Sequence, residues 1–241
     1  MDSDDALVGR LLSRREAIAL LAAAGGAWAG WGTAGARPPA PPGMCVARPR
    51  LEEGPYFVDE RLNRADIRSD PADGSVRAGV PLQLAIHVSR MASTACTPLA
   101  GVLVDVWHCD ADGIYSDVRD PSFDTTGKKF LRGSQRTDAA GTARFTTIYP
   151  GWYHGRTVHI HFKLRGPATD GRSFDFTSQL FFDDAFTDRV FAQPPYASRG
   201  PRTVRNERDG IYREGGSQLV LAVTPDGPGY AAAFNIGLQG V

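Results

Sequence analysis

The feature that most constrains the fold is a series of short segments with strand periodicity, which begins after residue 45. Between Pro81 and Val88 apolar residues occupy every second position, as in a half-buried strand. Residues 101–108 are rich in β-forming residues and apolar on both faces, which indicates a central strand covered on both sides. Four further segments continue the pattern: 144–148, 157–164, 179–182 and 218–224.

Turn residues separate these segments, and no long stretch after residue 45 has the periodicity of a helix. Gly, Pro and Asp cluster at 110–113, 138–141, 150–151 and 225–227. The one helix we expect is short and spans 184–192, just before Pro194 and Pro195. Many short strands joined by turns are typical of an all-β fold. We therefore predict one domain over residues 45–241, an antiparallel β-sandwich with long loops and at most short helices.

The first 36 residues have the features of an export signal. Arg14 and Arg15 precede an uncharged apolar run at 17–31, and the small-residue motif Ala34-Gly35-Ala36 follows it. The paired arginines indicate the twin-arginine route. A membrane anchor is the alternative, but the run is shorter than the roughly 20 apolar residues that cross a bilayer. We predict a signal peptide at 1–36, a Pro-rich linker at 37–44, and an exported protein, periplasmic or secreted, without a stable membrane anchor after cleavage.

Charge and cysteine content indicate which classes of partner and which disulfide to expect. Lys+Arg and Asp+Glu both total 27, so we expect no nucleic-acid partner, and a small molecule or a second copy of the chain instead. Three cysteines in an oxidising compartment allow one disulfide. We favour Cys45–Cys96, because both residues lie in turn-like segments flanked by proline. Cys109 is then expected to be a small buried side chain, with a soft metal ligand as the alternative.

The segment most informative about function combines two histidines with a strand pattern. Side chains of a strand alternate between faces, so His159 and His161 share one face while Ile160 and Phe162 point to the other. Two imidazoles two residues apart on a rigid strand can share a metal ion. Two histidines on a polar, solvated face remain an alternative, because the pattern is short and common.

Two tyrosines extend this possible donor set. Tyr153 lies in the loop that leads into the histidine strand, and Tyr115 follows the central strand predicted at 101–108. Phenolate oxygen together with imidazole nitrogen suits a trivalent, oxophilic metal better than zinc or copper(I), and tyrosinate is a known iron ligand. The chemistry allows these two tyrosines to join the histidines, but spacing alone does not select them from the seven in the chain.

Several stretches resemble the intradiol ring-cleavage dioxygenases, the group that includes protocatechuate 3,4-dioxygenase and catechol 1,2-dioxygenase. They are EGPYF at 53–57, VDVWHCDADGIYS at 104–116 and PGWYHGRTVHIHF at 150–162, with 179–182 and 184–200 also similar. These stretches follow the family's order over nearly all of the chain after the signal. The combination of two tyrosines with H-x-H is the specific part of the resemblance.

By position, the resemblance implies one Fe(III) per chain, held by Tyr115, Tyr153, His159 and His161. Tyr153 matches the ligand that leaves the metal when substrate binds and can accept a substrate proton. Arg156 matches an arginine that stabilises charge on the bound substrate, and Gln179 matches a glutamine beside the site. Without the resemblance, Arg156 would be interpreted as a surface arginine and Gln179 as a polar residue at a strand edge.

The activity that this resemblance implies is cleavage of a catechol-type ring between its two hydroxyls. Both atoms of O2 would be incorporated, and the product would be a muconate-type diacid. The partners are then a small aromatic diol and O2, and because the family commonly assembles, we also expect a homo-oligomer. Three alternatives stay open: a non-catalytic β-sandwich that carries a metal or small ligand, a zinc or copper enzyme that uses His154 with the histidine pair, and a structural adhesion module.

Overall fold

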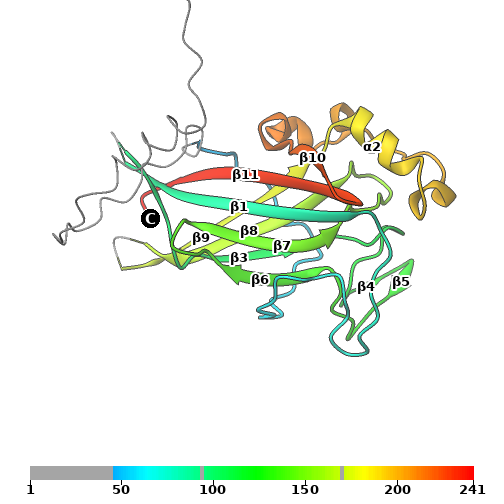
Figure 1. Ribbon diagram of the computed structural model, residues 1–241, viewed down its shortest axis with the longest axis horizontal. Helices are drawn as coiled ribbons and strands as arrows, with labels where there is room; N and C mark the ends of the chain where they lie inside the picture. Colours follow the sequence, from blue (N-terminus) through cyan, green and yellow to red (C-terminus); the bar gives the residue numbers. More distant parts are fainter. Residues whose placement is uncertain (1–45, 93–94, 169–170) are drawn as a thin grey trace, which may run out of the picture. The chain divides into compact units, whose positions relative to one another are not determined.

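A computed structural model describes residues 46–92, 95–168 and 171–241 (Figure 1). The signal peptide predicted at 1–36 and the linker predicted at 37–44 therefore lie outside the described residues. Within the described ranges, no helix combines the length and the apolar character needed to cross a membrane.

The described residues form two main sheets and a small two-stranded ribbon. Their strands are β1 (Pro81–Met91), β2 (Cys96–Pro98), β3 (Leu103–Trp107), β4 (Arg119–Asp120), β5 (Phe123–Asp124), β6 (Arg132–Arg136), β7 (Thr142–Ile148), β8 (His159–Pro167), β9 (Ser173–Phe181), β10 (Ala222–Asp226) and β11 (Gly229–Gln239). The first sheet has the order β10-β11-β1-β2, with β7 also paired to β1; the second has the order β6-β3-β8-β9. Strands β4 and β5 form the ribbon.

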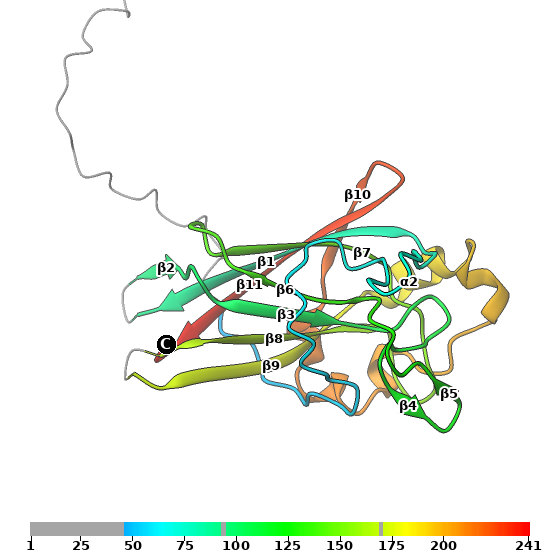
Figure 2. The same cartoon turned by 90° about the horizontal axis from the view of Figure 1, so that it is seen from below.

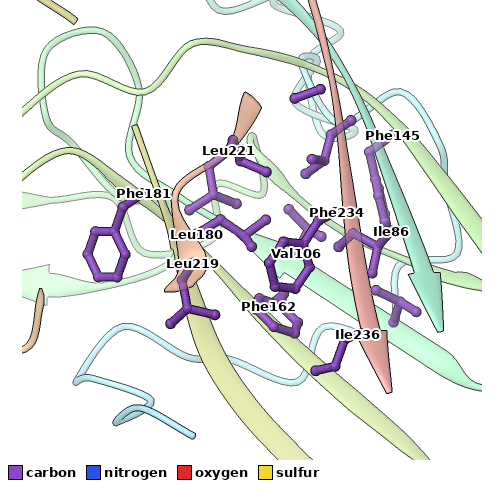
Figure 3. Close-up of a cluster of buried hydrophobic side chains, with 14 of the residues drawn as sticks. Ile86, Val106, Phe145, Phe162, Leu180, Phe181, Leu219, Leu221, Phe234 and Ile236 are labelled. Atoms are coloured by element: carbon purple, nitrogen blue, oxygen red, sulfur yellow. The ribbon is translucent and has the colours of Figure 1, made fainter. Parts of the chain in front are cut away.

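The apolar sides of the two sheets face each other and form the main core. In Figure 2, β1 and β7 lie above β3, β8 and β9. Figure 3 shows Phe145 and Phe234 of the first sheet among Val106, Phe162 and Leu180 of the second. The rings of Phe162 and Phe234 meet edge to face, with centroids 5.5 Å apart. This arrangement confirms the predicted all-β sandwich.

Among the described residues, helical structure consists of one short helix and four 3-10 turns. Helix α2 (Asp184–Phe191) begins where the sequence predicts, because the Asp183 side chain accepts a hydrogen bond from the backbone N of Phe186 at 2.7 Å. The 3-10 turns are η1 (Tyr196–Arg199), η2 (Asn206–Arg208), η3 (Tyr212–Glu214) and η4 (Gly216–Leu219). They follow α2 in the chain and lie with it along the upper right of Figure 1.

The alternation in the sequence predicts the buried faces correctly. Leu82, Leu84, Ile86 and Val88 of β1 all lie in the core, and β3 is central in its sheet. Val158, Ile160, Phe162 and Leu164 also point into the core, as predicted for the face opposite the histidines.

The segment 218–224 was predicted as one strand, and this prediction is wrong in its first half. Residues Gly216–Leu219 form η4, and β10 begins only at Ala222. The reason is that the chain passes here from one sheet to the other. The backbone N of Leu221 donates to the carbonyl of Phe181, the last residue of β9, at 2.9 Å, and the next residue starts a strand of the first sheet.

The pairing of the sheets contains a feature that the sequence did not predict. Strand β11 pairs in parallel with β1 from Leu82 to Met91, so the first sheet is mixed, while all pairs in the second sheet are antiparallel. Parallel neighbours require a long crossover between them. The strands β6 and β11 themselves were also not predicted.

The cysteines agree with the predictions as far as they are described. Cys109 is a free thiol and is buried, as expected for a small packed side chain. Cys96 is disulfide-bonded. The favoured pairing of Cys96 with Cys45 stays a prediction, because Cys45 lies outside the described residues.

Candidate metal centre

Strand β8 presents His159 and His161 on the side of the second sheet that faces away from the main core, which we call the site face. Each residue is only 2% exposed. Their Nε2 atoms lie 3.0 Å apart, so the two rings converge on one point. The spacing of two along a strand explains their common face, and the solvated-face alternative for this pair is wrong because both rings are buried.

Neighbouring strands hold the His161 ring from the side. A row of residues runs across the second sheet in register: Arg132 of β6, Trp107 of β3, His161 of β8 and Gln179 of β9. The Trp107 indole stacks on the His161 ring, with centroids 4.9 Å apart and an interplanar angle of 7°. On another side, a Cβ added to Gly54 would lie 3.4 Å from Cε1 of His161, which shows how closely the 53–57 loop approaches.

Two loops bring the tyrosines to the histidines. The hydroxyl of Tyr115 lies 3.4 Å from Nε2 of His159, and the hydroxyl of Tyr153 lies 3.3 Å from the same atom. The two phenol rings meet edge to face, with centroids 5.6 Å apart. The structure therefore brings together Tyr115, Tyr153, His159 and His161, four residues that lie on two loops and one strand.

Direct contacts join the two tyrosine loops to each other. The backbone N of Gly151 donates to the carbonyl of Asp110 at 3.1 Å. Arg199 of η1 bridges the two loops, because it donates to the carbonyls of Ala111 and Trp152. Gly113 has a φ of +79°, and a Cβ there would lie only 2.3 Å from the Trp152 oxygen. Glycine at position 113 therefore allows the loop that carries Tyr115 to pack against the loop that carries Tyr153.

Arg156 and Gln179, predicted as catalytic residues, contact each other at the edge of this cluster. Nη2 of Arg156 donates to Oε1 of Gln179 at 2.6 Å, and Nε2 of Gln179 donates to the carbonyl of Glu52 at 2.9 Å. Nε of Arg156 donates to the carboxylate of Asp209 at 2.8 Å. Arg156 is therefore not a free surface arginine, and Gln179 is fully buried.

Burial keeps both imidazoles neutral. It lowers the pKa of His159 to about 3, with a further contribution from the charge of Arg156, and it lowers the pKa of His161 well below its ordinary value. Nδ1 of His159 lies 2.6 Å from the carbonyl of Thr157, which can only accept. Nδ1 must therefore carry the proton, and the lone pair on Nε2 points toward Tyr115, Tyr153 and His161.

Burial has the opposite effect on the phenols, since it raises the pKa of both Tyr115 and Tyr153 above the ordinary value. A bound cation would reverse this shift, because it stabilises the phenolate. Without a cation, the site packs four groups with lone pairs around one point. Nδ1 of His161 is also buried without a hydrogen-bond partner among the described residues.

The donor set fits a trivalent metal. Two imidazole nitrogens and two phenol oxygens converge within hydrogen-bond distance, and hard oxygen donors favour oxophilic cations. Over residues 46–92, 95–168 and 171–241, no three or more His, Cys, Asp or Glu side chains cluster in a way that could hold an ion. His154, the third ligand in the zinc or copper alternative, is exposed in the loop before Gly155.

Some site residues were missed or left undecided by sequence reasoning. Trp107 lies in one of the stretches that carry the family resemblance, but its stacking on His161 depends on the β3–β8 register. No local pattern marks Asp209, because it lies about 50 residues beyond Arg156. Tyr149, just before the 150–162 stretch, lies in the main core, where its hydroxyl contacts that of Thr187 at 2.8 Å.

Comparisons with known proteins agree with this geometry. A family model described as dioxygenase matches residues 52–208. The protocatechuate 3,4-dioxygenase beta chain of Burkholderia cepacia is 30% identical over 202 residues, which cover 80% of each chain. The structure of an intradiol ring-cleavage dioxygenase from Tetranychus urticae superposes with a TM-score of 0.71 at 29% identity, over 82% of this chain and 96% of that one.

A second solved structure gives the same result. The dioxygenase domain of a dioxygenase and carbohydrate-binding protein fusion from Streptomyces sp. SirexAA-E is 31% identical, with a TM-score of 0.58, over 81% of this chain and the whole of that one. The family model covers more than half of the chain and includes all four converging side chains. The chain therefore belongs to the intradiol ring-cleavage dioxygenases, a family of oxidoreductases.

Proposed function

We propose that this chain holds one Fe(III) through Tyr115, Tyr153, His159 and His161 and cleaves a catechol-type diol between its two hydroxyls with O2. The product is a muconate-type diacid that contains both oxygen atoms. The observation that carries the proposal is the convergence of two phenol oxygens and two imidazole nitrogens on one buried point, at contact distances of 3.0 to 3.4 Å.

The charges of the donor set support a ferric ion. Two phenolates neutralise two of its three positive charges, and the imidazoles add none, because burial keeps them neutral. When bound, such an ion supplies Lewis-acid activation of the diol toward O2 and a template for both reactants. A diol that binds as a dianion must first lose two protons, so the site needs a base for one of them, and a hydroxide ion from solvent would take the other.

Tyr153 is the proposed base for one of these protons. Both tyrosines lie on loops, but Tyr153 is only partly buried, whereas Tyr115 is 1% exposed in a cluster with Trp107 and Cys109. As a phenolate, Tyr153 would accept a proton from a diol hydroxyl, whereas Tyr115 would remain one of the residues that hold the ion. The buried pair His159 and His161 is held by Thr157 and Trp107, so these ligands also keep their positions.

Arg156 is the proposed electrostatic partner of the reacting diol. Its charge is close enough to lower the pKa of Tyr153 against the larger, opposite effect of burial. A fixed guanidinium next to Tyr153 would stabilise negative charge that develops on the bound diol. Gln179 holds one edge of the guanidinium, and the 53–57 loop covers the His161 side of the site and limits access of water.

Metal analysis and oxygen uptake test the proposal together. Purified protein is expected to contain one iron per chain. With catechol, protocatechuate, hydroxyquinol and substituted catechols as a panel, at least one diol is expected to consume one O2 and give a product with the mass of the diol plus O2. The matched variant is Tyr115→Phe, which removes one donor oxygen and keeps the ring. Its iron content and oxygen uptake are expected to fall below those of the wild type.

Two results would contradict the proposal. Bound zinc or copper with no affinity for iron would reject the donor assignment. Iron and catechol binding without oxygen uptake would instead support the carrier function. In both cases the variant control would show whether the observed metal depends on the four converging side chains.

We also propose that the chain is exported by the twin-arginine route. The support is the sequence alone: Arg14 and Arg15, the apolar run at 17–31 and the Ala34-Gly35-Ala36 motif. Replacing both arginines with lysine is expected to leave the full-length protein in the cytoplasm, as measured by fractionation. Export of this variant at the normal level would reject the proposal.

A further inference from the structure

A buried carboxylate lies directly behind the proposed catalytic arginine. Asp209 is 0% exposed, and both of its oxygens accept hydrogen bonds. Oδ2 accepts from Nε of Arg156 and from the backbone N of Thr157, both at 2.8 Å. Oδ1 accepts from the backbone N of Tyr212, also at 2.8 Å. A buried charge is costly unless it is paired and hydrogen-bonded, so this site holds Asp209 in one position.

The segment that carries Asp209 is itself anchored to the second sheet. Nδ2 of Asn206 donates to the carbonyl of Phe182 at 2.8 Å, and its Oδ1 accepts from the hydroxyl of Thr157 at 2.7 Å. The backbone N of Asn206 donates to Asp184 at 3.2 Å. Residues 206–212 are therefore fixed to the end of β9 and to α2, and they provide a rigid support for the carboxylate.

Asp209 accepts hydrogen bonds from two adjacent residues, Arg156 and Thr157. It pairs with the side chain of Arg156, and it accepts from the amide of Thr157, whose carbonyl receives the Nδ1 proton of His159. Nε and Nη2 of Arg156 are committed to Asp209 and Gln179, and among the described residues Nη1 has no hydrogen-bond partner. The third nitrogen is thus left for another ligand in a defined orientation.

We propose that Asp209 is a positioning residue of the active site, which fixes the guanidinium of Arg156 so that its Nη1 faces the reacting diol. The proposal rests on the proposed function, because it assigns Arg156 a substrate. It goes beyond that function by identifying a residue outside the donor set and distant in sequence, whose effect on the reaction passes through Arg156. Gln179 fixes the other edge of the same guanidinium, so both contacts are needed to define its plane.

A double-mutant cycle between Asp209 and Arg156 tests the proposal. Asp209→Asn keeps the side-chain size but removes the charge and replaces one of the two acceptor oxygens with an NH2 group, so Arg156, Thr157 and Tyr212 can no longer all donate to this side chain. We expect kcat for the best diol of the panel to fall about 100-fold, as for a misplaced catalytic group. Binding of catechol without O2, followed by tryptophan fluorescence, should change less than about threefold, because the loss concerns the reaction step.

The second arm of the cycle distinguishes an effect that passes through Arg156 from a general loss of structure or activity. In an Arg156→Gln background, Asp209→Asn should change kcat by less than about twofold, since the residue through which it acts is already gone. Asp188→Asn is the matched control: it makes the same change in another aspartate that pairs with arginines, Arg202 and Arg205, without contact to Arg156. This control should keep the wild-type kcat.

Asp209→Glu covers the case in which the asparagine variant does not fold. It keeps the buried charge but moves the carboxylate by one methylene, so we expect a folded protein with kcat lowered about tenfold. Equal losses from Asp209→Asn in both backgrounds, or wild-type kcat in Asp209→Asn or Asp209→Glu, would overturn the proposal.

A structural readout distinguishes failure of this inference from failure of the proposed function. With Ga(III), a diamagnetic ion of the same charge, in place of iron, the Arg156 Nε–H signal in NMR should exchange slowly with solvent in the wild type and in Asp188→Asn, but rapidly in Asp209→Asn. If the wild type consumes no O2 with any diol, the proposed function fails, and this signal still decides whether Asp209 fixes Arg156. Slow exchange in Asp209→Asn would overturn the positioning role independently of activity.

Discussion

The two ends of the site face of β8 differ in burial and charge, although both belong to the same strand. At one end, the site end, His159 and His161 are 2% exposed and neutral. At the other, the charged end, Lys163 pairs with Glu53 at 2.5 Å. Arg165, also at the charged end, bonds to Asp59 at 3.0 Å and to Asp105 at 2.8 Å.

The difference comes from what covers each end. The site end is packed by the loops that carry Tyr115 and Tyr153, by Gly54 and by the segment of Asp209. The charged end is covered mainly by carboxylates, of which Asp175 is 54% exposed in its side chain. Residues two positions apart on this face of β8 therefore form a buried donor site where loops cover the strand. They form an ion-pair network where carboxylates cover it.

The largest effect is expected at the site end. His161→Ala removes one donor and the ring that stacks on Trp107. We expect oxygen uptake to fall by more than about 1,000-fold, since loss of a residue behind a ligand already costs about 10- to 100-fold. Iron content and oxygen uptake are measured on the folded protein. Activity above one tenth of the wild type would show that the site end is not the metal site.

A substitution one residue further along tests whether the two faces of β8 are separate. Phe162 is 0% exposed and points into the main core, away from the site. Phe162→Ala should lower the free energy of unfolding by about 3–5 kcal/mol through the cavity it leaves. Activity per folded molecule should stay near the wild-type value. A loss of activity as large as that of His161→Ala would contradict this separation.

The pH dependence of stability probes the buried charge at the site end. Burial raises the pKa of Asp209, but hydrogen bonds from Arg156, Thr157 and Tyr212 lower it more, so the net shift is downward from 3.8. A lowered pKa in the folded state adds stability above the unfolded value and loses it as pH falls. Wild type should exceed Asp209→Asn by about 2 kcal/mol near neutral pH.

This advantage should shrink as the pH falls below about 4, as measured by urea unfolding across the acid range. Arg156 and Asp209 are largely buried, so solvent screening reduces the effect little. An advantage that grows as the pH falls would mean that burial dominates and that the folded pKa of Asp209 is raised. The asparagine variant serves as its own reference, because it does not titrate at this position.

The smallest effect is expected at the charged end. Lys163→Met removes the ammonium but keeps an apolar stem near the ring of Phe57, over which the ammonium lies at 4.5 Å. Its partners are substantially exposed, so the loss should be at most about 1 kcal/mol, and oxygen uptake should not change. A loss as large as that of Asp209→Asn would show that both ends of the face depend equally on buried charge.

The donor residues differ in how far the sequence could identify them. Alternation placed His159 and His161 on one face and Ile160 and Phe162 in the core, and the structure has this arrangement. Tyr115 and Tyr153 required the family resemblance, because spacing did not distinguish them from the other tyrosines. Their approach to His159 depends on loop contacts such as that of Gly113 with Trp152, which lie far apart in sequence.

Other features had no local pattern at all. The parallel pairing of β11 with β1 joins two strands that are separated in the chain by β2 to β9, α2, the 3-10 turns and β10. Segment 218–224 changes sheets in its middle. The contact of Asp209 with Arg156 joins residues that are 53 positions apart.

The sequence by itself determined the sandwich class, the two faces of β8 and the chemical types of the donors, because side-chain alternation and residue chemistry are local properties. Only the tertiary structure decided which end of β8 is dry, which indole stacks on His161 and which carboxylate fixes Arg156. Those choices depend on strand register and on loop packing, which bring together atoms that no periodicity along the chain relates.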